Sequence, residues 1–287
     1  MAQNGAIPAG TTMGAVRLAT ADLDRMRDFY RDAIGLTELG PDDGVTRLGA
    51  GDQRIVELVS EPSAQPRPFG TSGLFHLAIL VPSRADLARA LQRVADAGWR
   101  LSGASDHLVS EALYLSDPEG NGIELYRDRP REEWPVRDGQ LQMDTLPLDL
   151  DGLLGELRRE DSASPMPAGT RIGHVHLNVG DLPAAESFYA GTLGFDVTVR
   201  GYPGALFVSA GGYHHHLGLN TWSGDGAPPP PPGTRGLRQF EIELPSSDDL
   251  AAEEARLREA GFEPRREDDR VYATDPSGNG VVLTAAS

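Results

Sequence analysis

Gly173-His-Val-His-Leu-Asn-Val-Gly-Asp-Leu182 is a repeated stretch: Gly14-Ala-Val-Arg-Leu-Ala-Thr-Ala-Asp-Leu23 precedes it with the same pattern. The Phe-Tyr pair that follows at residue 29 returns at residue 188 with the same offset. Repetition at a fixed offset indicates that the chain is built from similar supersecondary units. These two stretches therefore predict the start of equivalent modules.

A second pair of repeats lies between and after the first pair. Gly73-Leu-Phe-His-Leu-Ala-Ile-Leu-Val-Pro82 corresponds to Gly236-Leu-Arg-Gln-Phe-Glu-Ile-Glu-Leu-Pro245. Each ends on a loop and an apolar run, Asp117-Pro-Glu-Gly-Asn-Gly-Ile-Glu-Leu125 and Asp275-Pro-Ser-Gly-Asn-Gly-Val-Val-Leu283. The predicted domain organisation is two modules within 1–128 (13–62 and 72–128), a connector over 129–170, and two modules within 171–287 (172–223 and 235–286).

Within each module the hydrophobic period changes in the same order. An alternating segment such as His176 to Val179 predicts a strand, Asp-Leu then begins an amphipathic helix, and short strands punctuated by Gly follow. The prediction is an α+β protein with four βαβββ modules. One such module exposes an apolar sheet face, so we expect the modules to pair into two curved sheets, each around a cavity.

The charge and the amino-acid composition of the chain exclude several classes of function. The 287 residues carry 26 Lys+Arg against 43 Asp+Glu, a formal net charge of −17, which argues against nucleic acid and anionic membranes as partners. The chain has no Cys, so a metal would need His, Asp or Glu ligands. The longest apolar stretch is too short for a membrane span and no signal-like segment begins the chain, so we expect a cytoplasmic protein.

The fourfold repeat with its Asp-Leu, Phe-Tyr and Asp-Pro-x-Gly-Asn motifs resembles the vicinal oxygen chelate superfamily of glyoxalase I, bleomycin-resistance proteins and extradiol dioxygenases. The stretches at 104–130 and 211–222 resemble the CatE-type catechol-2,3-dioxygenases within it. The resemblance implies a metal held by residues of the first and last strands of paired modules. It also implies a role in aromatic compound degradation.

The positions that the resemblance assigns to metal ligands are unevenly filled. They hold Arg17 in the first module, His76 and Glu124 in the second, His176 in the third, and Gln239 with Val282 in the fourth. Only a pairing of the second module with the third brings two His and one carboxylate together, the ligand set of non-haem Fe(II) oxygenases. We therefore expect His76, Glu124 and His176 to bind Fe(II), with Mn(II) as the alternative, and the first and fourth modules to form a metal-free cavity.

Competing interpretations apply to these residues. A single His on an apolar strand is more often a packed core residue than a ligand. Glu57 is an alternative ligand, or it is solvated or paired with Arg17. An inward carboxylate between Ile123 and Leu125 would be costly without a partner, which favours a functional Glu124.

The resemblance also implies catalytic residues beyond the metal. His215, in the run Tyr213-His-His-His216, is predicted to be the acid/base, with His214 and His216 on the other face of the strand unless the register is shifted by one. Tyr114 and His107 are predicted to orient the substrate, although Tyr114 packing at a rim is an open alternative. Phe75, Leu108 and Trp222 are expected to border the substrate.

The function predicted from these residues is an Fe(II)-dependent extradiol dioxygenase, with a small aromatic diol and O2 as its substrates. Two alternatives are a glyoxalase-like metal-dependent lyase or isomerase, and a non-catalytic protein that binds an aromatic ligand or antibiotic. A homo-oligomer is compatible with the sequence.

Overall fold

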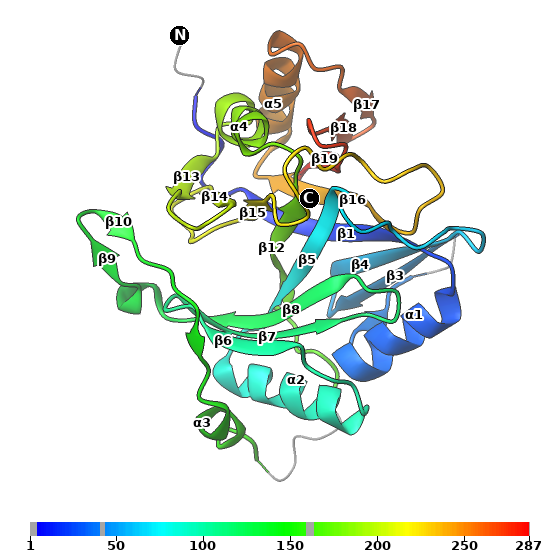
Figure 1. Cartoon of the computed structure of the whole chain (residues 1–287), viewed down its shortest axis with the longest axis vertical. Coiled ribbons are helices and arrows are strands. Elements are labelled where there is room, and N and C mark those ends of the chain that lie inside the picture. The colour runs from blue at the N-terminus through cyan, green and yellow to red at the C-terminus, as the bar shows by residue number, and fades with distance from the viewer. Residues whose placement is uncertain (1–4, 41–43, 159–163, 287) are drawn as a thin grey trace.

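In the described residues, two large curved β-sheets, one two-stranded sheet and five α-helices make up the fold (Figure 1). The structure is a computed structural model, and it describes residues 5–40, 44–158 and 164–286. Residues 41–43 of the first predicted module and 159–163 of the predicted connector lie outside the described residues. One sheet has eight strands in the order β17-β18-β19-β16-β1-β4-β3-β2, and the other has nine in the order β11-β6-β7-β8-β5-β12-β15-β14-β13.

The predicted βαβββ order occurs four times along the chain. The first module is β1 (Thr12–Thr20), α1 (Leu23–Phe29), β2 (Thr37–Glu38), β3 (Val45–Ala50) and β4 (Gln53–Ser60), and the second is β5 (Gly73–Leu80), α2 (Arg84–Asp96), β6 (Gly103–Asp106), β7 (Ser110–Ser116) and β8 (Gly122–Asp128). The third is β12 (Arg171–Asn178), α4 (Leu182–Glu186), β13 (Asp196–Val199), β14 (Ala205–Ser209) and β15 (Leu217–Asn220), and the fourth is β16 (Gly236–Leu244), α5 (Ser247–Glu259), β17 (Arg265–Glu267), β18 (Arg270–Thr274) and β19 (Gly280–Ala285). The predicted α+β class and module order are confirmed.

The modules pair as the ligand positions indicated. Strand β5 of the second module pairs antiparallel with β12 of the third, and β1 of the first pairs antiparallel with β16 of the fourth. Each sheet is therefore assembled from both halves of the chain. The connector between the second and third modules contributes a small hairpin, β9 (Val136–Arg137) with β10 (Gln140–Leu141). It then forms β11 (Leu146–Pro147) and α3 (Leu150–Leu154). The hairpin extends away from the sheets in Figure 1.

The repeated Asp and Tyr residues have structural roles. Asp22 and Asp181 cap α1 and α4 by accepting from backbone N–H groups in the first helical turn. Tyr30, which follows α1, donates to Asp117 in the loop of the second module at 3.1 Å, and Tyr189 of the third module donates in the same way to Asp275 of the fourth at 2.9 Å. These buried hydrogen bonds connect consecutive modules, whereas the sheets connect the first with the fourth and the second with the third.

One apolar core is shared by both sheets. It includes large buried side chains from every module, among them Tyr30, Leu48, Leu77, Tyr189 and Phe240. Among the described residues, no helix is long and apolar enough to cross a membrane. The shared core leaves the concave face of the nine-stranded sheet free to form a polar site.

Candidate metal centre and active site

Three neighbouring strands direct ligand side chains to one point. In the nine-stranded sheet, Ala78 on β5 lies opposite Glu124 on β8 and opposite His174 on β12. His76 precedes Ala78 by two residues, so both side chains lie on the same face of β5. The small Ala78 side chain leaves room for its neighbours to converge above it.

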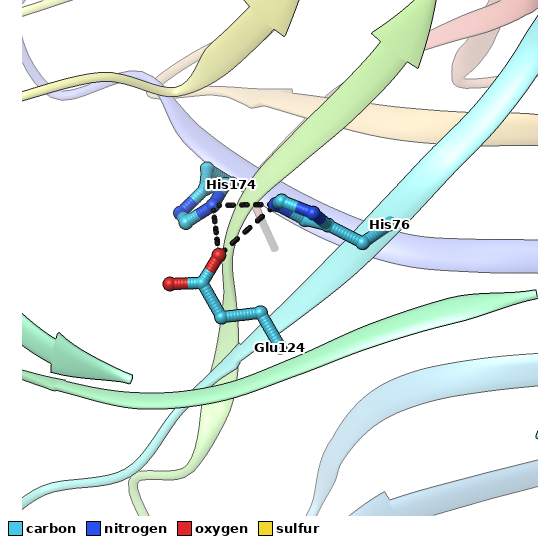
Figure 2. A group of neighbouring side chains, drawn as sticks. All are labelled: His76, Glu124 and His174. Carbon is cyan, nitrogen blue, oxygen red and sulfur yellow. Dashed lines mark hydrogen bonds and ion pairs between the residues drawn. The ribbon is translucent and has the colours of Figure 1, made fainter. Parts of the chain in front are cut away.

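The three converging side chains form a compact triangle (Figure 2). His76 Nε2 lies 3.0 Å from Glu124 Oε2, His174 Nε2 lies 3.1 Å from the same oxygen, and the two Nε2 atoms are 3.2 Å apart. All three residues are buried. His76, Glu124 and His174 are the only group of this kind found among the described residues.

The donor set fits a divalent metal better than it fits protons. Ligands at about 2.0–2.2 Å from a metal and at right angles to each other lie about 3 Å apart, as these three atoms do. If each imidazole instead donated to the shared oxygen, the short contact between the two Nε2 atoms would bring two N–H groups together. Two His and one carboxylate on one side of a metal leave the remaining positions for substrate.

The protonation states also suit metal ligands. Burial lowers the pKa of His174 to about 4, which keeps its ring neutral at neutral pH. Burial alone would raise the pKa of the Glu124 carboxyl, but the adjacent His174 and His76 rings hold that pKa well below its usual range. A neutral imidazole and an ionised carboxylate are the forms that coordinate metals.

The structure groups His174, and not the predicted His176, with His76 and Glu124. His176 lies two residues along β12, opposite His76, and faces the same cavity. Its ring packs near His76, Trp222 and Phe75, with centroid distances of 5.0, 5.3 and 5.1 Å, and its buried Nε2 has no hydrogen-bond partner among the described residues. Strand alternation places both His residues on one face, but only the register between β5 and β12 decides which one meets Glu124.

A cavity of about 590 Å³ opens from the triangle. Phe75 and Trp222, which contact each other at a centroid distance of 5.1 Å, are 40% and 44% exposed and lie at its edge. Leu108, which we expected beside them, is not among the cavity-lining residues. The apolar and aromatic lining suits a flat organic ligand.

The predicted catalytic residues lie around this cavity. His215 lines it and packs against His174 at a centroid distance of 4.1 Å with the ring planes tilted by 48°, whereas His214 and His216 are not among the lining residues. Tyr114 and His107 also line it, and Tyr114 Oη is 2.7 Å from His107 Nε2. Burial and the adjacent Glu124 carboxylate raise the pKa of Tyr114 well above its usual value, so its hydroxyl stays protonated.

The corresponding part of the eight-stranded sheet is filled with ion pairs. Arg17 pairs with the buried Glu57 at 2.6 Å, and Arg54 contacts both Glu57 at 2.6 Å and Glu241 at 3.1 Å. Arg270 pairs with Glu241 at 2.7 Å. The predicted pairing of Arg17 with Glu57 is confirmed. The carboxylates of Glu57 and Glu241 are therefore in contact with Arg side chains at the place where a metal would have to bind them.

Four βαβββ modules around a buried two-His, one-carboxylate centre define a protein of the vicinal oxygen chelate type. Residues 12–125 and 171–283 match the Glyoxalase/Bleomycin resistance protein/Dioxygenase superfamily, and the chain belongs to this superfamily.

Similar proteins lie in several branches of this superfamily. The chain is 43% identical over 277 residues to the catechol-2,3-dioxygenase of Bacillus subtilis (strain 168), covering 95% of this chain and 96% of the relative. It is 32% identical over 123 residues to biphenyl-2,3-diol 1,2-dioxygenase 3 of Rhodococcus globerulus, covering 41% of this chain and 64% of the relative. The crystal structure of glyoxalase I from Zea mays has the same fold, with a TM-score of 0.58, 19% identity, and coverage of 96% of this chain and 92% of that one.

Proposed function

We propose that this protein is an extradiol dioxygenase that opens the ring of a small catechol with O2, using Fe(II) held by His76, Glu124 and His174. The observation that carries the proposal is the triangle of three ligand atoms, 3.0–3.2 Å apart, at the base of an aromatic-lined cavity. The nearly full-length similarity to a catechol-2,3-dioxygenase supports the choice of substrate class.

When bound, Fe(II) would bring catechol and O2 together and allow electrons to pass between them. The side chains of the cavity have separate tasks. Phe75 and Trp222 would pack against the ring and exclude water at the cavity edge. This packing would orient the two hydroxyl groups toward the triangle.

Tyr114 and His107 are proposed to orient the substrate. The backbone carbonyl of Asp144 lies 2.7 Å from His107 Nδ1 and can only accept, so His107 Nδ1 carries a hydrogen. In a neutral ring His107 Nε2 then accepts from the Tyr114 hydroxyl at 2.7 Å. The lone pairs of the Tyr114 oxygen remain available to accept a hydrogen bond from a substrate hydroxyl.

His215 is proposed to be the acid/base. Its ring packs against His174, so it lies beside the position where a substrate hydroxyl would approach the metal. Burial lowers the pKa of His215 well below its usual value, which makes the ring a neutral proton acceptor at the start of the reaction. We expect His215→Asn to retain the metal and to slow cleavage about 10²- to 10⁴-fold, the usual contribution of a positioned acid/base.

A lyase or isomerase of the glyoxalase kind is less well supported by this cavity. That chemistry normally uses a second carboxylate at the metal, and the acidic residues that line the cavity are Glu124 and the exposed Asp144. An imidazole, that of His215, lies beside the triangle, with its ring centroid 4.1 Å from that of His174.

The deciding experiment is anaerobic loading of the purified protein with Fe(II), followed by addition of catechol and 18O2. We expect one O2 consumed for each catechol lost and both labelled atoms in a single ring-opened product. Loss of catechol without O2 uptake, or no turnover of any substituted catechol by the iron-loaded protein, would refute the proposal. Parallel loading with Mn(II) tests the alternative metal.

A further inference from the structure

A chain of hydrogen bonds runs from the side of the fold into the candidate active site through His214. This buried ring lies between Asp128, at the end of β8, and His215. Its Nε2 is 2.8 Å from Asp128 Oδ1, and its Nδ1 is 2.7 Å from His215 Nδ1. Both ring nitrogens of His214 are therefore used, one on each neighbour.

The donor in each hydrogen bond of His214 follows from which atoms can donate and which can only accept. A carboxylate oxygen accepts, so His214 Nε2 carries the hydrogen that it shares with Asp128. A neutral His214 then has a lone pair on Nδ1, and His215 must donate to it from its own Nδ1. His215 Nε2, at the opposite edge of that ring, is left without a hydrogen.

Asp128 also accepts a hydrogen bond from a second donor. Tyr213 Oη lies 3.2 Å from the same Oδ1, and Tyr126 Oη lies 2.8 Å from Tyr213 Oη. Burial and the Asp128 charge raise the pKa of Tyr213 well above its usual value, so this phenol remains a donor. The ring of Trp134, at a centroid distance of 5.3 Å, packs against His214 from the connector.

We propose that Asp128 and His214 are positioning residues that hold His215 with its hydrogen on Nδ1, so that Nε2 is the lone pair that takes the proton of the substrate. The proposal rests on the proposed function for the substrate and for the acid/base role of His215, whereas the tautomer of His215 does not depend on it. In the step itself the substrate O–H bond breaks, its electron pair stays on oxygen, and an N–H bond forms at His215 Nε2. The His215 ring then carries a positive charge, which the Asp128 carboxylate stabilises through the hydrogen bonds of His214. The same proton later passes from His215 Nε2 to the product.

The direct test reads the tautomer without any turnover. Full-length protein labelled with 15N-histidine, purified without added metal, is examined by long-range 1H–15N NMR at pH 7.5. His215 is assigned by the signals that disappear in His215→Asn. We expect a protonated Nδ1 and an unprotonated Nε2 in His215, whereas a hydrogen on Nε2 would overturn the proposal.

Two substitutions of His214 separate positioning from packing. Both His214→Leu and His214→Asn lose the imidazole and the contact with Asp128, but only the Asn side chain offers an oxygen near the former Nδ1. We expect His214→Leu to lose the single tautomer and to lower kcat about 10- to 100-fold with little change in KM, as for other supporting residues. His214→Asn should restore the tautomer but only part of kcat, because the contact with Asp128 is still missing, and equal loss in both variants would refute the positioning role.

Tyr213→Phe is the matched control. It removes the second hydrogen bond to Asp128 and leaves His214 and its two contacts in place. We expect the His215 tautomer to be unchanged in this variant. If catechol is not a substrate but the tautomer and its dependence on His214 are as described, the proposed function fails and the positioning role stands.

Discussion

At the scale of single residues, His174 and His176 differ in what surrounds their Nε2 atoms. His174 Nε2 faces Glu124 and His76, whereas His176 Nε2 has no hydrogen-bond partner among the described residues. We expect His174→Ala to lose most of the bound metal and His176→Ala to keep about one metal per chain. Metal analysis of both variants, purified in parallel, measures this.

The same two variants, His174→Ala and His176→Ala, can also contradict the proposed ligand set. Metal retained in His174→Ala and lost in His176→Ala would support the ligand set first expected from the sequence. The circular dichroism spectrum of each variant checks that it is folded, because the ring of His176 packs against Gly218, where an added Cβ would come within 2.8 Å of His176 Cγ.

A second residue-scale prediction concerns Tyr114. Removal of its hydroxyl in Tyr114→Phe breaks the hydrogen bond with His107 and changes none of the three side chains of the triangle. The hydrogen bond that a neutral substrate hydroxyl donates to Tyr114 Oη contributes about 0.5–1.5 kcal/mol, so kcat/KM for catechol should fall about 2- to 10-fold with metal content unchanged. Steady-state kinetics with metal analysis tests this, and unchanged kinetics would reduce Tyr114 to a packing residue at the cavity wall.

Of the three side chains that the structure brings together, the sequence predicted two, His76 and Glu124, and placed His176 where the structure has His174. His76 and Glu124 belong to one module, and their spacing follows from one parallel strand pair, β5 with β8. His174 meets them across an antiparallel pair between modules, whose register shifts between Ile172 and His174 and again after His176. Strand alternation could place His174 and His176 on the same face, but it could not choose between them.

At the scale of elements, α5 contains an unusual carboxyl group. Glu253 is buried on this helix near Arg256, and burial raises its pKa to about 7. The unfolded chain loses this proton near pH 4.5 and the folded chain near pH 7, so the folded state is destabilised progressively as pH rises through this interval and stays so above it.

Glu253→Gln removes this dependence. We expect the variant to match the wild type near pH 4.5 and to be more stable above pH 7, by up to about 3 kcal/mol at about 1.4 kcal/mol per pH unit. Urea unfolding of metal-free protein at both pH values measures the difference. A variant less stable than the wild type at pH 8 would show instead that the ion pair with Arg256 dominates.

The elements were largely predictable because each module repeats the same local chemistry. The Asp and Ser caps, the alternating strands and the Asp-Pro-x-Gly-Asn loops are short-range signals, and the α+β modules that they predict are present. The links between modules depend on long-range contacts. The hydrogen bonds from Tyr30 to Asp117 and from Tyr189 to Asp275 join motifs that the sequence showed only as separate repeats.

At the scale of the whole molecule, the two sheets are predicted to differ in metal binding. His76, Glu124 and His174 form the candidate metal-ligand group of the nine-stranded sheet, while Arg side chains surround Glu57 and Glu241 in the eight-stranded sheet. We expect one metal per chain, and two equivalents bound per chain would contradict the assignment.

Metal removal should also lower thermal stability. A ligand that binds only the folded state at 100 times its Kd stabilises the protein by about 2.7 kcal/mol. Chelation should therefore lower Tm in the wild type and leave Tm of His174→Ala nearly unchanged, which differential scanning calorimetry measures.

A cytoplasmic location and a homo-oligomeric state remain predictions, to be tested by cell fractionation and by analytical ultracentrifugation.

The strand pairing between halves has a consequence for synthesis on the ribosome. Strand β1, made first, pairs with β16, whose residues begin at Gly236, and β5 must wait for β12. While these partners are still being translated, one edge of β1 and one edge of β5 have no native partner strand, which exposes the nascent chain to aggregation. Early release of a truncated chain should yield insoluble material, whereas co-expression of the two halves as separate chains would allow each to supply the strands that the other lacks.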